Sequence, residues 1–306
     1  MRSLRSASSA VVCGVLLMST LAFARSPEGS FQKSFTVSGP VNLEVFTHSG
    51  DITVRSGPAG TVSVSGKIYS GNGWIFGTRT AAVSEVEKNP PVQQNGDTIH
   101  IKYPEEKNIS VDYEITVPAD TEVHTHSNSG DQTVEGIRRS VALEADSGDM
   151  RLRDISGEVH IRTGSGDVDG RQIAGSIHAE TGSGDIRLEE SGSGEIRVRT
   201  GSGDIGIQGA NGSLYADSGN GDITIAGNVT GPWSVHTGSG DVRLNLPSQA
   251  AFDLDASTSS GDLNVDHAVT TAVQGKARDE HIVVGKVGGG GPSLVVRTGS
   301  GDVQIH

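Results

Sequence analysis

The triplet Ser-Gly-Asp recurs along the chain at a nearly constant interval, and strand-forming residues follow each copy. A short fixed period predicts one supersecondary unit that is stacked many times, so this repeat constrains the fold more than any other feature. Further copies stand at Asp51, Asp262 and Asp302, and Asn220 once replaces the serine. The aspartates of the regular run follow one another at steps of 18 or 19 residues: Asp131, Asp149, Asp167, Asp185, Asp204, Asp222 and Asp241.

Each repeat contains two stretches in which apolar and polar residues alternate. In one repeat Ile177, Ala179 and Thr181 alternate with polar residues, Gly182–Gly184 interrupts the pattern, and alternation resumes after Asp185. Alternation with a period of two is typical of a half-buried strand. Each repeat is therefore predicted to supply two strands and two corners.

Similar residues at similar offsets favour parallel stacking of the repeats in register. We predict an all-β fold, a two-sheeted parallel β-solenoid whose coils of about 18 residues lie about 4.8 Å apart. A three-sided helix with six-residue faces would have the same period. It fits less well, because the inward residues form two groups in each repeat.

The inward and outward positions of the repeat can be assigned from the alternation. The third inward residue of each first strand is small (Ala145, Thr163, Thr200, Ser218 and Thr237), which we interpret as the sharp edge of a narrow core. The outward residue five before each corner aspartate alternates in charge over most of the run, and opposite charges on neighbouring strands stabilise a sheet. This expected charge column is His126, Glu144, Arg162, Glu180, Arg199, Asp217 and His236.

The N-terminus has the pattern of a secretory signal. Arg2 and Arg5 precede an apolar run and an Ala-Phe-Ala sequence, which predicts a signal peptide over residues 1–24. The single cysteine, Cys13, lies inside it, so the mature chain would have no disulfide. The mature chain would keep 22 basic and 37 acidic residues, a net charge of −15. That charge argues against a nucleic-acid partner.

The regular repeat does not cover the whole mature chain. Residues 25–118 are predicted to form an N-terminal β region that caps the solenoid, and residues 119–306 the solenoid itself. Within the cap, residues 70–94 are expected to be irregular, and residues 266–292 are expected to form a loop that crosses the far end. Trp74, Ile75 and Phe76 would either plug the end of the core or form an exposed contact patch.

Several motifs resemble those of the bacterial "putative adhesin" β-repeat family, a domain of unknown function in exported and cell-envelope proteins. They are T-x-S-G-D-I-x-V around Asp51, the strand ending at Val117-Pro118-Ala119, and the closing segment from Gly288 to Ile305. The likeness covers most of residues 31–306. It implies adhesion by analogy, and it brings no catalytic residues with it.

Two sets of side chains are weak candidates for metal ligands. The corner carboxylates of Asp149, Asp167, Asp185, Asp204, Asp222 and Asp241 could bind Ca²⁺, because carboxylate oxygens suit hard cations. However, their motif differs from that of glycine-rich calcium rolls, and hydrogen bonds to turn N–H groups explain the same aspartates. His160 and His178 share one offset in adjacent coils and could hold zinc, but Arg162 nearby opposes a cation.

No enzyme signature is found. The chain has neither a G-x-S-x-G elbow nor an H-E-x-x-H motif. We therefore expect an exported, non-catalytic, adhesin-like binding or structural protein without a cofactor, in the periplasm, outer envelope or extracellular space. Its ligand would be an envelope or surface protein or a polysaccharide, and no membrane span would remain after signal cleavage. The alternatives are a carbohydrate-active enzyme of the polysaccharide lyase type and a calcium-dependent envelope protein.

Overall fold

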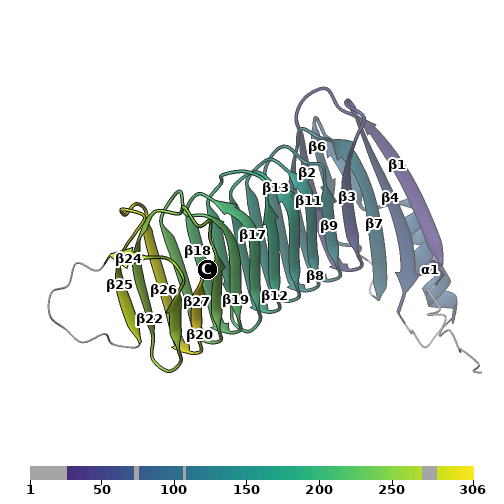
Figure 1. Ribbon diagram of the computed structural model, residues 1–306. Helices are drawn as coiled ribbons and strands as arrows, with labels where there is room; N and C mark the ends of the chain where they lie inside the picture. The colour runs from purple at the N-terminus through teal and green to yellow at the C-terminus, as the bar shows by residue number, and fades with distance from the viewer. Residues whose placement is uncertain (1–25, 72–75, 106–107, 271–280) are drawn as a thin grey trace, which may run out of the picture.

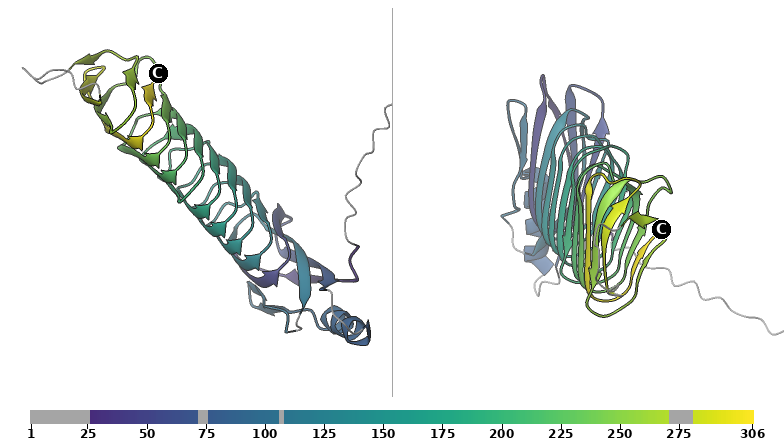
Figure 2. Two further views of the ribbon diagram at one scale, coloured as in Figure 1. Left: turned by 90° about the horizontal axis from the view of Figure 1, so that it is seen from below. Right: turned by 60° about the vertical axis from the view of Figure 1, so that its left-hand side comes forward.

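Two long β-sheets face each other along the whole molecule and enclose a narrow core (Figure 1). The computed structural model describes residues 26–71, 76–105, 108–270 and 281–306. The expected signal peptide with Cys13 lies outside the described residues, as do Trp74, Ile75 and the side chain of Phe76. The predicted two-sheeted solenoid is confirmed, and seen from below its coils form a continuous stack (Figure 2).

The first sheet, sheet A, has 13 strands among the described residues. Its strands are, in spatial order, β1 (Gly29–Thr36), β4 (Thr61–Ser70), β7 (Ile109–Pro118), β3 (Ile52–Gly57), β9 (Gln132–Glu135), β11 (Met150–Ile155), β13 (Val168–Ile173), β15 (Ile186–Glu190), β17 (Ile205–Asn211), β19 (Ile223–Asn228), β21 (Val242–Asn245), β27 (Val303–Ile305) and β23 (Leu263–Val265).

The second sheet, sheet B, has 14 strands in the same part of the chain. Its strands are, in spatial order, β24 (Val269–Thr270), β25 (Ile282–Val287), β22 (Phe252–Thr258), β26 (Ser293–Ser300), β20 (Trp233–Ser239), β18 (Leu214–Asn220), β16 (Ile196–Thr200), β14 (Ile177–Ser183), β12 (Val159–Ser165), β10 (Val141–Ser147), β8 (Thr121–Ser129), β2 (Val41–Ser49), β6 (Thr98–Ile101) and β5 (Val92–Asn95).

The coils stack in parallel with the register that the repeat predicts. Val159 of β12 pairs with Val141 of β10 on one side and with Ile177 of β14 on the other. Arg162 likewise pairs with Glu144 and Glu180. The whole charge column is confirmed as a row of directly neighbouring residues, from His126 through Asp217 to His236.

The inward residues are buried as predicted, but the small third position has a further cause. Thr181 is 5% exposed, and its hydroxyl donates a hydrogen bond of 3.0 Å to the carbonyl oxygen of Gly166 in the preceding coil. Thr200, Ser218 and Thr237 make the same bond in their coils. A hydroxyl is therefore favoured there because it satisfies a corner carbonyl as well as fitting a narrow edge.

The N-terminal end of the molecule abandons the parallel pattern. β1 runs antiparallel to β4, β4 antiparallel to β7, and β5 antiparallel to β6. The stretch expected to be irregular contains the helix α1 (Phe76–Lys88), which packs against β1 and β4. That expectation was wrong, because the apolar residues of this helix form only a weak amphipathic pattern that does not mark it as a helix.

The boundary between cap and stack also differs from the expected one at residue 118. β2 and β3 pair in parallel with β8 and β9 of the first regular coil. The Asp51 copy of the repeat is therefore a true coil of the stack. It lies there because Val41, Leu43 and Val45 continue the buried columns of sheet B.

The spatial order of the last two coils is the reverse of their order in the chain. The coil of β26 and β27 lies directly against β20 and β21, and the coil of β22 and β23 lies outside it. The expected loop over residues 266–292 was also wrong in part, because β25 lies there and pairs antiparallel with β22. The outermost coil therefore comes earlier in the chain, and the later coil of β26 and β27 lies between it and the coil of β20 and β21.

Candidate functional site

The corner aspartates form a continuous ladder along one edge of the solenoid. The Oδ1 atom of each aspartate accepts the backbone N–H of the aspartate in the next coil, at 2.8–3.1 Å. In spatial order the ladder is Asp112, Asp51, Asp131, Asp149, Asp167, Asp185, Asp204, Asp222, Asp241, Asp302 and Asp262. Each coil therefore fixes the corner of the next one.

Arginines on sheet A bind the second carboxylate oxygen in most of these coils. Arg151 donates to Oδ2 of Asp131 and of Asp149, at 2.8 and 2.7 Å. Burial raises the pKa of Asp131, but the Arg151 hydrogen bond and the Asp149 N–H outweigh burial and lower that pKa overall. Arg187 and Arg243 bridge later pairs of corner aspartates in the same way.

The candidate calcium ligands are thus already bonded to the protein. Between Asp131 and Asp241, Asp204 is the one corner aspartate without an arginine partner in the described part of the chain. Across the residues that the structure describes, no group of three or more His, Cys, Asp or Glu side chains is placed to hold a metal ion. The ladder serves the register of the coils.

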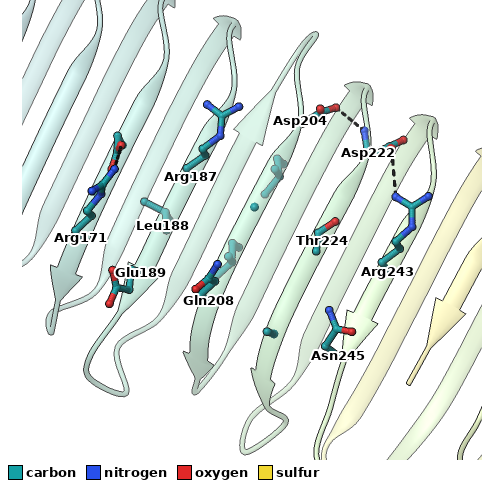
Figure 3. Close-up of a pocket in the computed structure, with 16 residues that line it drawn as sticks. Arg171, Arg187, Leu188, Glu189, Asp204, Gln208, Asp222, Thr224, Arg243 and Asn245 are labelled. Atoms are coloured by element: carbon teal, nitrogen blue, oxygen red, sulfur yellow. Dashed lines mark hydrogen bonds and ion pairs between the residues drawn. The ribbon is translucent and has the colours of Figure 1, made fainter.

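A shallow groove lies on the outer face of sheet A beside Asp204 (Figure 3). Its volume is about 660 Å³, and its floor contains Gly206, where a side chain would meet open space. Arg187 and Arg243 stand on either side, and Glu189, Gln208 and Asn245 add polar groups along it. The groove is deepest at Gly206 because this residue has no side chain, whereas Arg187 and Thr224 occupy the same place in the two adjacent coils.

A second groove of about 660 Å³ follows the outer face of sheet B. Its floor is a row of glycines, and one wall is the charge column. A Cβ atom at Gly182 would lie 2.6 Å from the carbonyl oxygen of Gly164 in the preceding coil, so glycine is required at this outward place. Arg162 pairs with Glu180 at 3.3 Å, and Arg199 with Asp217 at 2.9 Å.

The two histidines considered as zinc ligands are brought together on sheet B. The rings of His160 and His178 have centroids 5.9 Å apart. The Nε2 atom of each ring lies near a carboxylate oxygen. The distance is 3.0 Å from His160 to Oε1 of Glu158 and 3.3 Å from His178 to Oε1 of Glu180. The site therefore consists of two His–carboxylate pairs, of which His160–Glu158 is exposed and His178–Glu180 is half-buried.

A cluster of six aromatic rings near the N-terminal end of sheet B was not predicted from the sequence. Phe46 lies within 6.3 Å of the ring centroids of His100, Tyr103, His124 and His126, and His48 stacks on Tyr103 at 4.3 Å. We call these six residues the Phe46 platform. The outward alternation of His124 with His126 and of Phe46 with His48 is visible in the sequence, but the partnership between β2, β6 and β8 is not.

Glu190 and Tyr113 are buried side chains whose polar atoms have no hydrogen-bond partner in the described residues. Glu190 is 7% exposed at an inward position that is isoleucine in the two preceding coils, and neither carboxylate oxygen has a hydrogen-bond partner in the described structure. Burial raises the pKa of Glu190 to about 7, and the nearby N–H of Gly192, which makes no well-aligned hydrogen bond to the carboxylate, opposes this rise only in part. The buried Tyr113 hydroxyl in the cap also lacks a partner there, and burial raises its pKa.

Most charged groups that line the two grooves in the described part of the chain are ion-paired, either within one coil, as Arg187 with Asp185, or between coils, as Arg199 with Asp217. Among the described residues, no helix combines the length and the apolar character that a membrane crossing needs.

A family model described as Toastrack DUF4097 matches this chain over residues 27–198 and again over residues 78–306. The match confirms the expected resemblance to an adhesin-like β-repeat family of unknown function. None of the curated proteins compared with the chain matches it.

Two solved structures are similar along nearly their whole length. One is described as a putative cell adhesion protein from Clostridium sporogenes ATCC 15579, with 12% identity, a TM-score of 0.22, and coverage of 90% of this chain and 98% of the other. The second is described as a putative adhesin from Bacteroides fragilis NCTC 9343, with 13% identity, a TM-score of 0.32, and coverage of 92% and 100%. Such low TM-scores carry no argument about function.

Proposed function

Because this chain belongs to the Toastrack DUF4097 family, we propose that it is an exported, non-catalytic protein of the bacterial cell envelope that binds an envelope or surface ligand, as an adhesin does. The observation that carries this proposal is the pair of open grooves, each about 660 Å³, on the outer faces of sheets A and B. Long polar grooves on a rigid stack suit the binding of an extended partner.

The charge pairing on these faces supports binding in preference to catalysis. A lyase-type enzyme needs carboxylates and a basic residue that converge on one reacting bond and are free to exchange protons. In the sheet A groove, Arg243 is bonded to Asp222 and Asp241, and Arg187 to Asp185. These groups hold the coils together, and a ligand would meet them as hydrogen-bonding partners.

Export rests on the signal pattern of residues 1–24, and the periplasm, outer envelope and extracellular space are its destinations. Fractionation of cells that express the full chain should place the shortened protein outside the cytoplasm. Recovery of the uncleaved chain in the cytoplasm would overturn the exported part of the proposal.

The binding function is tested by incubating the mature chain, residues 25–306, with washed cell-envelope fractions and measuring what sediments with them. We expect saturable retention that unlabelled protein displaces. A heat-unfolded sample of the same chain serves as the control. Retention no greater than that of the control would overturn the proposed function.

The two alternatives are separated by cheap assays on the same material. Release of new sugar ends from a polysaccharide panel would favour the carbohydrate-active enzyme, and we expect none. We also propose that no cofactor is needed, because the corner aspartates are bonded to the next coil. Thermal melts with a chelator and with added Ca²⁺ should therefore coincide, whereas a large rise with Ca²⁺ would favour the calcium-dependent protein.

A further inference from the structure

The Phe46 platform is an unusual feature for a chain with 6 Phe, 4 Tyr and 2 Trp residues. Phe46, Tyr103 and three of its histidines are half-buried on the outer face of sheet B, and His48 is exposed. The rings come from β2, from β8, and from β6 and the segment that follows it, and these segments are far apart in the chain. None of these side chains belongs to the buried core between the sheets.

Carboxylates surround the aromatic surface. Glu44 lies 2.8 Å from the Nδ1 atom of His100, and Glu144 lies 3.4 Å from that of His126. The side chains of both glutamates are at least one-third exposed. Burial and then the nearby charge of Asp146 raise the pKa of Tyr103. The platform thus offers flat apolar rings beside several hydrogen-bond acceptors.

The platform is also continuous with the sheet B groove. Asp146, which acts on Tyr103, lines the end of that groove nearest to the platform. From there the glycine floor runs through Gly164, Gly182, Gly201 and Gly219, one glycine for each coil. An aromatic surface at one end of a straight polar groove is a shape that fits a linear polymer.

We propose that the Phe46 platform stacks against a pyranose ring of a neutral or amino-sugar polysaccharide, whose chain continues along the sheet B groove. This inference rests on the proposed binding function and names its ligand class. A pyranose has a face of C–H groups edged by hydroxyls. Aromatic faces pack against the C–H groups, and carboxylates and imidazoles form hydrogen bonds with the hydroxyls.

The acidic border of the platform and the charged residues beside it favour a polysaccharide over a nucleic acid or a protein as the ligand. Bases of a nucleic acid also stack on aromatic rings, but such sites lie in positively charged grooves. Here Glu44, Glu144 and Asp146 border the rings, and the expected mature chain has a net charge of −15. A stable protein interface needs a broad patch with a largely apolar centre. The neighbouring outward residues are instead charged.

The test is a calorimetric titration of mature protein with cellohexaose, chitohexaose and maltohexaose, and with polygalacturonate as an anionic probe. We expect at least one of the neutral or amino-sugar hexamers to bind. Phe46→Ala and Tyr103→Ala should each weaken that binding at least about tenfold. The matched control is Tyr69→Ala, because Tyr69 is a half-buried tyrosine of β4 in sheet A, whereas the platform and the groove lie on sheet B; its variant should stay within about threefold of wild type.

Circular dichroism and melting of each variant establish that it is folded, and His48→Ala replaces Phe46→Ala if that variant unfolds. Absence of binding to all three hexamers, preference for polygalacturonate, or equal affinity of the platform variants and wild type would each overturn the inference. The envelope-retention assay separates the two proposals. If Phe46→Ala is retained like wild type, the proposed function stands and the platform is not its site.

Discussion

The regular stack, from β8 to β21, and the N-terminal cap of β1, β4, β7 and α1 obey different rules. In the stack every strand lies between two near-copies of itself, and the same bonds recur in each coil. In the cap the strands are antiparallel and the contacts are individual, such as the edge-to-face pair of Phe31 and Tyr113. A residue in the stack must therefore suit both neighbouring coils, whereas a residue in the cap must suit one local site.

The glycines of the two regions illustrate the difference. Gly184 has φ +152°, and a Cβ atom there would overlap the carbonyl oxygen of Gly166 in the adjacent coil. Gly96, in the turn between β5 and β6, has φ +62°, and a Cβ atom there would meet nothing within 4 Å. Both positions favour glycine for their backbone angle, but only the first is also enclosed by another coil.

The largest expected effect comes from these two glycines. Gly184→Ala should lower the free energy of unfolding by roughly 3–5 kcal/mol, because backbone strain and a clash with another coil act together. Gly96→Ala should cost roughly 1–2 kcal/mol from the left-handed conformation alone. Urea denaturation of both variants measures the difference. Equal losses would show that coil-to-coil contact does not set the glycine requirement.

The second prediction concerns the buried polar groups, Glu190 in the stack and Tyr113 in the cap. The pKa of Glu190 is about 7 in the folded chain and ordinarily 4.5, so the folded state holds the proton more tightly. Stability from this group is complete below pH 4.5 and is lost as the pH rises through 7, a loss of roughly 3 kcal/mol. Glu190→Ile should remove this loss, since isoleucine fills the same column in the two preceding coils.

Melting temperatures between pH 4.5 and pH 8.5 provide the measurement. Glu189→Gln is the matched control, because Glu189 is exposed in the same strand and should leave the pH profile unchanged. Tyr113→Phe should also leave it unchanged, since burial moves the pKa of Tyr113 further from this range. A wild-type profile that rises over the same interval would contradict the assignment.

A third prediction separates the inward and outward sides of one strand. Thr181 packs inward and bonds Gly166, whereas Glu180 points outward. Thr181→Trp should therefore lower the free energy of unfolding by roughly 1–3 kcal/mol or more, because a large side chain at this closed edge displaces its neighbours. Glu180→Trp should change stability much less. Similar shifts in melting temperature for the two variants would break the assigned alternation.

The smallest effects concern surface charges, and the first of them lies in the charge column. Arg162→Glu places three acids in consecutive coils and should cost roughly 1 kcal/mol at low salt. The loss should shrink when salt screens the charges. Reversing Glu144 and Glu180 to arginine in the same chain should restore much of it. Denaturant melts at two salt concentrations measure both effects, and a neutral Arg162→Glu at both would count against the column as a source of stability.

In the cap, Lys67 pairs with Glu114 at 2.6 Å, and this pair is not part of a repeated column. Lys67 also lies opposite Asp112, so Lys67→Glu brings three acids together and should cost roughly as much as Arg162→Glu under the same conditions. Clearly different losses at the two sites would show that the repeat itself changes the contribution of a surface charge to stability.

The periodic part of the molecule could be predicted almost completely from the sequence. The two-strand coil, the buried triplets such as Val141, Leu143 and Ala145, and the neighbours of Arg162 all follow from one interval and one alternation. Repetition makes this possible, because each local pattern is supported by its copies. The hydroxyl bond of Thr181 could not be seen in the same way, since size alone explained the residue.

The non-periodic features depended on contacts between distant segments. The Phe46 platform joins residues 46–48, 100–103 and 124–126, and their approach leaves no repeating trace in the sequence. The helix α1 was missed because its turns lack a clear apolar face. The position of β26 and β27 beneath β22 and β23 could not be predicted either. Asp262 and Asp302 carry the same motif, so either coil could have stacked on the coil of Asp241.

The sequence by itself determined the coil, its register and the direction of each side chain in the stack, because these depend on short-range alternation repeated at a fixed interval. Only the tertiary structure decided which coil lies at each end, how the antiparallel cap closes the core, and where the exposed rings meet. Those outcomes depend on packing between segments that are about 60 to 80 residues apart. Packing of that kind is specific to each pair of segments, and no local pattern encodes it.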